Sequence, residues 1–446
     1  MEKLTHRIGG GVKICLPRSV ICLSTFVALE QEDWFEDEIS FVRALSTQGL
    51  NAIDIGANFG FYTLALAKNS ESVVWAFEPT AQPHAYLTAS LAENRNSNVK
   101  VIKTALSDFT GTTTFTLGWT PEMNAMNKDL NGSVGSENAP VNTLDQAAEE
   151  YGIENVDFIK IDAEGQELAI LGKAGRFFDV NSPLAMFEIK DQDAQVFDAA
   201  QWFLDNGFNL YRLVPGLNVL IPYTRGEPLD SFCLNLFACR KDRSRQLSER
   251  GLLVQHSEEC EAPEDQTDPY DAHARAHEPG RPPAERWAML EAAYSILSRR
   301  HAENPADLGI LAAAARLANE TGRRREAVGL ARHAFEKHMN GISADEAVLP
   351  ATVRYDGNGT DSNRLIWLRA SLMELYLIRS AYSAYYVGQP YFDKLASLRE
   401  TPYWSAPMER RRQLLGMKLG TEKHFSAHPL LMEEGPENRN PGFWSK

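Results

Sequence analysis

Cysteine is scarce in this chain of 446 residues, which contains five: Cys15, Cys22, Cys233, Cys239 and Cys260. Their number is odd, they lie far apart, and no two have the Cys-x-x-Cys spacing of a zinc knuckle or a redox pair. The sequence therefore predicts neither a disulfide framework nor a zinc site, and we expect a cytoplasmic protein in a reducing environment.

Long apolar runs are missing as well. The most apolar early stretch, residues 12–29, is interrupted by Lys13, Pro17 and Arg18, so it is too short and broken to span a membrane. The first eleven residues lack the order of basic, apolar and small residues that a signal peptide has. We expect no membrane span, and residues 12–29 are more typical of a strand pair at a domain edge.

The chain also has no excess of positive charge. Forty-five Lys and Arg residues stand against 60 Asp and Glu residues, for a net charge of −15. Such a chain repels phosphate backbones, so we expect no nucleic-acid partner. A hydrophobic fraction of 43% and a charged fraction of 24% are those of soluble globular proteins. The length predicts two or three domains.

Short β-rich runs alternate with helical periodicity between residues 50 and 240. The expected strands are 51–55, 73–77, 99–104, 112–117, 156–161, 184–189, 209–213 and 232–239. The expected helices between them are 62–68, 83–94, 166–172 and 194–206. This alternation predicts an α/β fold, a mostly parallel sheet with helices on both faces, over residues 49–245. Residues 1–48 are expected to form lead-in strands and a helix packed on this domain.

The composition changes abruptly between residues 255 and 285. This window holds nine acidic residues, two arginines and five prolines, with almost nothing apolar. It buries too little surface to offset the entropy of ordering it. We therefore expect residues 246–285 to form an extended acidic linker, in which His256, His273 and His277 are solvated.

Every segment after residue 286 has helical periodicity. Small residues occur where the two helices of a tetratricopeptide repeat cross closely: Ala315, Ala318, Gly322, Ala327, Ala331 and Ala334. They predict a helical, tetratricopeptide-like domain over 286–446, with a possible protein partner. Simple helical packing without a binding role is the alternative. A further helix is expected over 365–386, and the arginines at 410–412 are expected on a solvated face.

The strongest motif runs from Asn51 to Gly60, Asn51-Ala-Ile-Asp-Ile-Gly-Ala-Asn-Phe-Gly60. It reads as an apolar strand that ends in Asp54, a glycine turn and the start of a helix, and ligands of such folds bind at the carboxyl ends of the strands. Gly56 and Gly60 let the backbone pass close to a ligand. Their spacing differs from the Gly-x-Gly-x-x-Gly of dinucleotide-binding proteins, and the sequence has no phosphate loop.

Acidic residues also follow the second and third strands. Glu78 lies 24 positions after Asp54, where an acid can accept hydrogen bonds from the ribose hydroxyls of an adenosine. This placement serves NAD and S-adenosylmethionine equally. Asp108 could accept a hydrogen bond from the adenine amino group, or it could be a turn residue before Gly111.

The fourth strand ends in a charged cluster. Lys160, Asp162, Glu164 and Glu167 lie within eight residues, and strand alternation places the first two on one face. Bringing these charged side chains together costs free energy unless they form ion pairs or take part in binding or catalysis. Such a cluster can deprotonate a hydroxyl, hold a divalent metal or form an ion-pair network. A helix dipole already favours an acid at position 167, so Asp162 and Glu164 are the stronger candidates.

Taken together, these segments resemble the FkbM family of S-adenosylmethionine-dependent methyltransferases. The resemblance covers about residues 51–190 and rests on Asp54-Ile-Gly-Ala-Asn-Phe-Gly60, Phe77-Glu-Pro79, Ala105-Leu-Ser-Asp108, Asn142-Thr-Leu-Asp145 and Lys160-Ile-Asp-Ala-Glu-Gly-Gln-Glu167. The acidic and aromatic residues 31–38 look like the lead-in of some members. The resemblance implies a class I methyltransferase fold, S-adenosylmethionine as cofactor, and methyl transfer to a hydroxyl of a sugar, glycan or natural product.

The resemblance also implies roles for individual residues. Four would cradle the methionine end of the cofactor: Asp54, Gly56, Asn58 and Gly60. Glu78 would bind the ribose, with Ser107 and Asp108 beside the adenine. A sugar hydroxyl is a poor nucleophile, so a carboxylate within hydrogen-bond reach would take its proton. The candidates for this catalytic group are Asp162, Glu164 and Glu188, with Lys160 beside them, and we predict no metal ligands.

Two hypotheses of other classes stay open. One is an NAD-dependent oxidoreductase, which the glycine spacing and the lack of a clear Tyr-x-x-x-Lys motif disfavour. The other is an interaction protein that binds partners through its helical half, with a vestigial nucleotide-type fold. Intact Gly56, Gly60, Glu78 and Asp162 argue against a vestigial domain.

Overall fold

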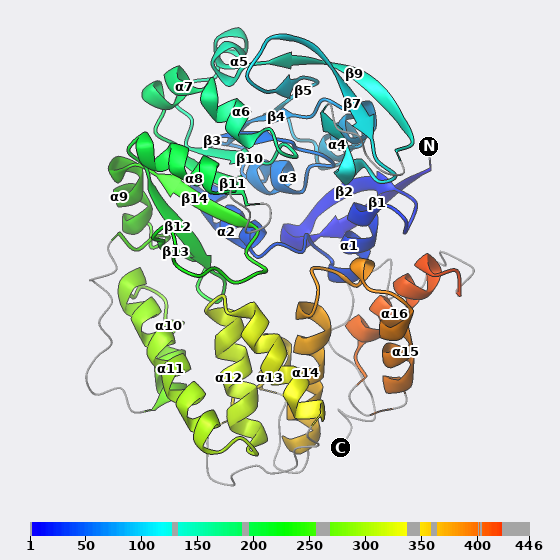
Figure 1. Ribbon diagram of the computed structural model, residues 1–446, viewed down its shortest axis with the longest axis vertical. Coiled ribbons are helices and arrows are strands. Elements are labelled where there is room, and N and C mark those ends of the chain that lie inside the picture. Colours follow the sequence, from blue (N-terminus) through cyan, green and yellow to red (C-terminus); the bar gives the residue numbers. More distant parts are fainter. Residues whose placement is uncertain are drawn as a thin grey trace.

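The computed structural model describes residues 2–126, 133–189, 196–255, 268–336, 348–357, 364–399, 401 and 404–421. Its upper half in Figure 1 is built on an eight-stranded sheet with the order β13-β12-β14-β11-β10-β3-β4-β5. The strands are β3 (Asn51–Ile55), β4 (Val73–Phe77), β5 (Val99–Ile102), β10 (Phe158–Ile161), β11 (Leu184–Glu188), β12 (Asn209–Val214), β13 (Val219–Pro222) and β14 (Asn235–Cys239).

Strands β5, β4, β3, β10 and β11 run parallel, whereas β14 is antiparallel to both β11 and β12. The chain proceeds outward from β3 to β5 on one side and from β10 to β11 on the other, so the strand order reverses between β3 and β10. A crevice for a ligand opens at the carboxyl ends of the strands at such a switch point. The predicted, mostly parallel sheet is confirmed, whereas its edge strand β13 was not among the expected strands.

Helices cover both faces of the sheet, as predicted. One face packs on α5 (Leu144–Tyr151), α6 (Glu167–Gly172), α7 (Gly175–Val180) and α8 (Val196–Asp205), and the other on α2 (Glu38–Leu45), α3 (Phe61–Ala67) and α9 (Lys241–Glu249). Ile53 belongs to the first core and its neighbour Ala52 to the second. Strands buried on both faces are apolar at most positions, which explains the nearly continuous apolar runs.

The N-terminal segment and a second sheet border this domain. The second sheet has four strands, β6 (Ala105–Leu106), β7 (Gly111–Leu117), β8 (Ala125–Met126) and β9 (Gly135–Asn142). The chain begins with the hairpin of β1 (Lys3–Ile8) and β2 (Val12–Pro17), followed by α1 (Leu23–Gln31). The strand pair predicted within residues 12–29 was therefore wrong in part. Only the first six residues form a strand, and α1 buries the remaining apolar side chains against the helical region.

The lower half in Figure 1 is helical. It contains α10 (Pro269–Ala276), α11 (Pro283–Glu303), α12 (Leu308–Glu320), α13 (Arg324–Glu336), α14 (Arg364–Arg379), α15 (Gln389–Leu398) and α16 (Ala406–Lys418). The predicted alanines of α12 and α13 share one buried cluster, so these two helices meet at small residues. The helix predicted over 365–386 ends at Arg379 and is followed by a short 3₁₀ turn over Ala384–Tyr386. The tetratricopeptide-like assignment stays a prediction.

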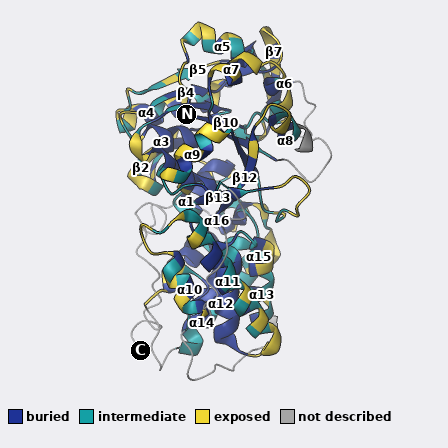
Figure 2. Cartoon of the chain, turned by 90° about the vertical axis from the view of Figure 1, so that its left-hand side faces the viewer, coloured by how far each residue is buried: buried dark blue, intermediate teal, exposed yellow. Residues whose placement is uncertain are grey.

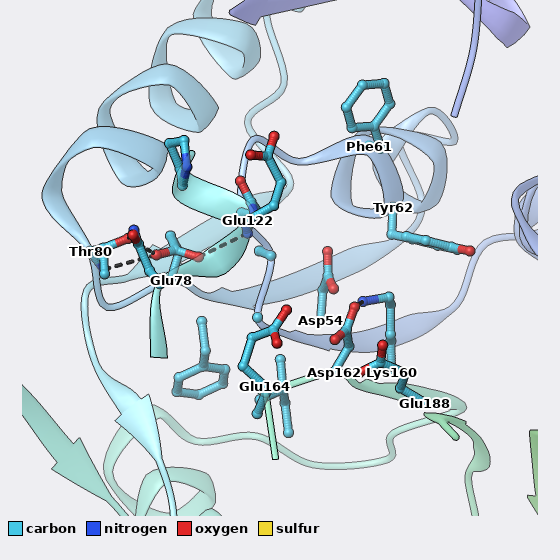
Figure 3. Close-up of a pocket in the computed structure, with 18 of the residues that line it drawn as sticks. Asp54, Phe61, Tyr62, Glu78, Thr80, Glu122, Lys160, Asp162, Glu164 and Glu188 are labelled. Carbon is cyan, nitrogen blue, oxygen red and sulfur yellow. Dashed lines mark hydrogen bonds and ion pairs between the residues drawn. The ribbon is translucent and has the colours of Figure 1, made fainter. Parts of the chain in front are cut away.

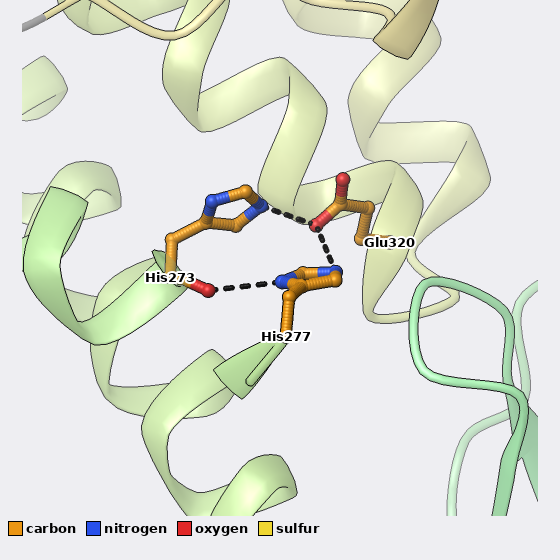
Figure 4. A group of neighbouring side chains, drawn as sticks. All are labelled: His273, His277 and Glu320. Atoms are coloured by element: carbon orange, nitrogen blue, oxygen red, sulfur yellow. Dashed lines mark hydrogen bonds and ion pairs between the residues drawn. The ribbon is translucent and has the colours of Figure 1, made fainter. Parts of the chain in front are cut away.

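Residues 268–285 do not form the extended linker that their composition predicts. Asp268 caps α10, and Ala272 and Ala276 bury its apolar side against α11 and the edge of the sheet. His273 Nε2 lies 2.8 Å from Glu320 Oε2, and His277 Nδ1 lies 2.9 Å from the His273 carbonyl oxygen (Figure 4). His273 is therefore largely shielded from solvent, whereas His277 is exposed, as predicted. The average composition of residues 255–285 hides two alanines at helical spacing, Ala272 and Ala276, whose burial orders the helix. His256 lies outside the described residues.

The arginines of α16 do not lie on a solvated face either. Arg411 pairs with Glu30 and Arg410 with Glu32, both on or next to α1, and both arginines are buried. The sheet edge at β13 is likewise covered, because Val219 and Ile221 share a core with α10, α11 and α12. Figure 2 shows buried residues in the sheet domain and in the helical region alike. Within the described residues, no helix has the length and apolar character needed to cross a membrane.

Candidate active site

A pocket of about 620 Å³ lies at the switch point of the sheet (Figure 3). Its volume is in the range of small-molecule sites, about 300–1,000 Å³. Eight of the predicted site residues line it: Asp54, Gly56, Asn58, Glu78, Lys160, Asp162, Glu164 and Glu188. Gly60, Ser107 and Asp108 do not. The topology thus brings together residues that are separated by up to 134 positions (54 to 188) in the sequence.

Asp54 and Asn58 place unsatisfied acceptors in the first turn. Asp54 is buried at the end of β3, and its Oδ2 accepts a hydrogen bond from Thr63 Oγ1 over 2.5 Å. Its Oδ1 and the Asn58 Oδ1 are buried and receive no hydrogen bond from the described residues. Burial raises the pKa of Asp54. Buried acceptors without donors are costly, so this turn fits a ligand that carries N–H or O–H groups.

The two glycines of the motif are required by packing. Gly56 has a φ of +76°, and a Cβ there would lie 1.8 Å from the Asp162 carbonyl oxygen. Gly60 has a φ of +95°, and a Cβ there would lie 2.4 Å from Leu87 Cδ1. Both positions therefore favour glycine for backbone conformation and for space. The close approach at Gly56 is to the neighbouring strand end, which holds the turn against the charged cluster.

Glu78 is anchored at the end of β4. Its Oε1 accepts hydrogen bonds from the backbone N–H and the hydroxyl of Thr80, at 2.8 and 2.5 Å. Its Oε2 accepts from the Asn58 N–H at 2.9 Å, and burial raises the pKa of the carboxyl group. Three of the roughly four acceptor positions of a carboxylate are thereby filled. At least one remains for a ligand.

Lys160 and Asp162 form an ion pair at the end of β10. Lys160 Nζ lies 2.7 Å from Asp162 Oδ2, and the two side chains are 5% and 30% exposed. Burial lowers the pKa of Lys160, but the carboxylates of Asp162, Asp54 and Glu36 outweigh burial and raise it overall. Lys160 is therefore a charged ammonium group. It stabilises Asp162 as an anion and fixes its position at the pocket wall.

Glu164, Glu167 and Glu188 surround this pair. Glu164 has a φ of +54°, in the tight turn between β10 and α6, and Figure 3 shows its side chain pointing into the pocket. Glu167 accepts hydrogen bonds from the N–H groups of Ala163 and Gly165, so it holds the turn, as its structural interpretation predicts. Oxygens of Asp162, Glu167 and Glu188 lie within 4.8 Å of one another.

The structure does not bring Ser107 and Asp108 to the pocket. Asp108 is exposed, in the turn before β7. Ser107 is buried and donates a hydrogen bond to Gln166 Oε1 over 2.9 Å. Gln166 itself lines the pocket. The geometry thus favours the turn interpretation of Asp108, and it gives Ser107 the role of positioning a lining residue.

Sequence reasoning missed several lining residues that come from distant segments. They are Trp34, Phe35 and Glu36 before α2, Glu122 before β8, and Tyr382 and Tyr386 after α14. Glu36 is half-buried and accepts hydrogen bonds from Tyr62 Oη at 2.5 Å and Trp34 Nε1 at 2.9 Å. Burial raises its pKa. The acidic and aromatic segment 31–38 was visible in the sequence, but nothing there connects it to tyrosines about 350 positions away.

Comparisons with known proteins agree with this geometry. Residues 54–210 match the methyltransferase FkbM domain family. No curated protein matches the chain. Similar solved structures include a methyltransferase FkbM from Methylobacillus flagellatus (18% identity, 43% of each chain, TM-score 0.30) and an S-adenosylmethionine-dependent O-methyltransferase from Thermotoga maritima (14% identity, 53% of this chain and 77% of that one, TM-score 0.28). The chain thus spans less than half of the first of these proteins, and TM-scores this low add nothing to the argument.

The match begins at Asp54 and ends in β12, so it covers the switch point and the charged cluster. The central strand order, with one antiparallel strand between β11 and β12, is that of class I methyltransferases. Residues 54–210 therefore form an S-adenosylmethionine-dependent methyltransferase domain of the FkbM family.

Proposed function

We propose that the protein transfers the methyl group of S-adenosylmethionine to a hydroxyl oxygen of a sugar, glycan or natural product. The observation that carries this proposal is the gathering of Asp162, Glu164 and Glu188 in one pocket with the unsatisfied acceptors of Asp54 and Asn58. The hydrogen-bond acceptors Asp54 Oδ1 and Asn58 Oδ1 suit the ammonium group at the methionine end of the cofactor. Carboxylates at the neighbouring strand ends suit the removal of a hydroxyl proton.

The residues of the pocket fit the cofactor. Asp54 Oδ1 and Asn58 Oδ1 would accept hydrogen bonds from its methionine end, beside the glycine turn. The remaining acceptor position of Glu78 would take a ribose hydroxyl. When bound, S-adenosylmethionine supplies an electrophilic methyl group on a sulfonium centre. Ser107 would act through Gln166, and Asp108, exposed and outside the pocket, would not contact the cofactor.

We assign the base to Asp162, with Glu164 as the second candidate. The Lys160 ammonium holds the Asp162 carboxylate anionic and in a fixed position at 2.7 Å, while 30% of the Asp162 side chain remains exposed. A positioned carboxylate can take the hydroxyl proton as the oxygen attacks. Lys160 then stays protonated and keeps the buried carboxylates paired. Glu164 and Glu188 lie near enough to orient the acceptor by hydrogen bonds.

Calorimetric titration of the full-length protein separates this proposal from its alternatives. The methyltransferase reading predicts saturable binding of S-adenosylmethionine and no binding of NAD. An oxidoreductase would bind NAD, and an interaction protein with a vestigial fold would bind neither. Methyl transfer is then followed with labelled cofactor on sugar and glycan fractions. Binding of the cofactor without transfer to any hydroxyl acceptor would contradict the proposed reaction.

A further inference from the structure

Part of the pocket wall is a continuous row of aromatic rings that lies mostly outside the matched residues 54–210. Trp34 contacts Phe61 with a centroid distance of 4.5 Å and Phe35 with one of 4.6 Å. Phe35 contacts Tyr382 at 5.6 Å, and Tyr382 contacts Tyr386 at 6.5 Å. All five line the pocket. The lead-in and the helical region together add this row to the methyltransferase domain.

The helical half of the row is held firmly against α1. The Glu30 carboxylate is buried and accepts hydrogen bonds from the Ser383 hydroxyl and from the Ala384 N–H, the latter at 3.0 Å. Tyr385 Oη donates to the Ile21 carbonyl oxygen at 2.6 Å, and Gln31 Nε2 donates to the Tyr382 carbonyl oxygen at 2.8 Å. Hydrogen bonds therefore fix the tyrosine segment 382–386 in place at the pocket wall.

The pocket is rich in carboxyl groups and poor in cationic ones. Among the described residues that line it there are seven carboxyl groups, one lysine, no arginine and no histidine. The carboxyl groups are Glu36, Asp54, Glu78, Glu122, Asp162, Glu164 and Glu188. Lys160 is already paired, and like charges at this density repel an anionic ligand. A phosphate or carboxylate on the acceptor would meet no free cation among these residues.

Glu122 is one of the carboxyl groups that line the pocket. Its Oε1 accepts a hydrogen bond from the Ser24 N–H at 2.7 Å, whereas its buried Oε2 receives none from the described residues. Tyr385, the neighbour of Tyr386, donates to the Ile21 carbonyl oxygen, so Glu122 and the tyrosine segment both contact residues 21–24 at the start of α1. Burial, together with the carboxylates of Glu122 and Glu36, raises the pKa of Tyr386 to about 12. Glu122 thus offers an acceptor to a hydroxyl or ammonium group in the same pocket as the aromatic row.

We propose that the aromatic row and Glu122 form an acceptor subsite for a carbohydrate that carries no phosphate or carboxylate group, either neutral or amino-bearing. The proposal rests on the proposed methyltransferase function. The apolar C–H face of a sugar ring packs on aromatic side chains, and an amino group is attracted both by their faces and by the carboxylates. The helical region then contributes directly to the choice of acceptor.

The test uses the full-length protein and matched sugars: a methyl glucoside, the corresponding amino sugar, the 6-phosphate and the glucuronide. We expect methyl transfer to the first two and little to the anionic pair. Tyr382→Ala, Tyr386→Ala and Glu122→Gln are each expected to raise the acceptor KM roughly five- to tenfold, with cofactor affinity within twofold. Phe109→Ala, an exposed aromatic residue outside the pocket, is the matched control and is expected to change neither value.

Melting curves with and without cofactor verify that each variant folds. Preferred turnover of the phosphate or the glucuronide would overturn the subsite proposal, and so would an unchanged acceptor KM in all three variants. In both cases wild-type methyl transfer would still support the proposed function. If the wild type binds cofactor but methylates none of the four sugars, the subsite proposal fails, and the proposed function is decided by transfer to the glycan fractions. Tyr386→Phe keeps the ring and is expected to retain most of the acceptor affinity that Tyr386→Ala loses.

Discussion

Arg411 on α16 donates from Nε to Oε1 of Glu30 on α1 over 2.6 Å, and the two side chains are 3% and 0% exposed. The same carboxylate binds Ser383 and Ala384, which precede Tyr386 at the pocket. One buried ion pair therefore joins the N-terminal segment, the last described helix and the pocket wall. It also accounts for a basic run that the sequence gives no reason to bury.

Removing Arg411 should destabilise the protein strongly. Arg411→Ala leaves the Glu30 carboxylate buried without its counter-charge, and breaking a buried pair in this way costs about 3–5 kcal/mol. Urea unfolding measures the loss, with Arg245→Ala on the exposed side of α9 as the control. The double variant Glu30→Gln/Arg411→Met should recover part of the loss, because it leaves no buried charge. A loss in Arg411→Ala no larger than in the control would contradict the structural role.

The base assignment predicts a loss of turnover without a loss of cofactor binding. Asp162→Asn should lower kcat by about 10²–10⁴-fold, the contribution typical of general base catalysis. Glu164→Gln should have a smaller effect. Asp108→Asn is the control, since Asp108 is exposed outside the pocket. Single-turnover kinetics and calorimetry report the two quantities separately. Full turnover in both Asp162→Asn and Glu164→Gln would show that neither residue is the general base.

Stability should fall as the pH rises through neutrality. Burial, followed by the charges of Glu36 and Asp37, raises the pKa of Glu38 to about 8, against about 4.5 in the unfolded chain. Between these values the folded state binds more protons than the unfolded state, so the free energy of unfolding decreases with pH. Urea unfolding at pH 5 and pH 8 measures the decrease. Glu38→Gln should reduce it by at least about 1 kcal/mol, whereas Glu249→Gln, exposed on α9, should leave it unchanged.

Chelation of divalent metals should leave methyl transfer intact. Asp162, Glu167 and Glu188 approach one another closely enough to be considered as metal ligands. However, Asp162 already has the Lys160 ammonium at 2.7 Å, and Glu167 is bonded to two backbone N–H groups. Activity is measured after dialysis against EDTA and after addition of Mg²⁺. An activity that EDTA abolishes and Mg²⁺ restores would establish a metal site instead.

Much of the sheet domain could be predicted from the sequence because its signals are local. The strand over 51–55 and the strand over 73–77 have the predicted bounds, since apolar runs ended by an acid or a glycine turn specify strands by themselves. Eight site residues share the pocket because parallel strands end at the same edge of the sheet. The linker prediction failed for residues 268–285, where two alanines at helical spacing determine burial and average composition does not.

The sequence by itself determined the α/β domain and the acids at the strand ends. Apolar periodicity, glycine and strand-end acids act over a few residues and require no knowledge of distant contacts. The tertiary structure alone decided which residues complete the pocket. Phe35 and Tyr382 meet there, and the Glu30–Arg411 pair joins α1 to α16 close by; such contacts between distant segments leave no local pattern. The helical region, which the sequence presents as a separate unit, thereby contributes Tyr382 and Tyr386 to the pocket wall.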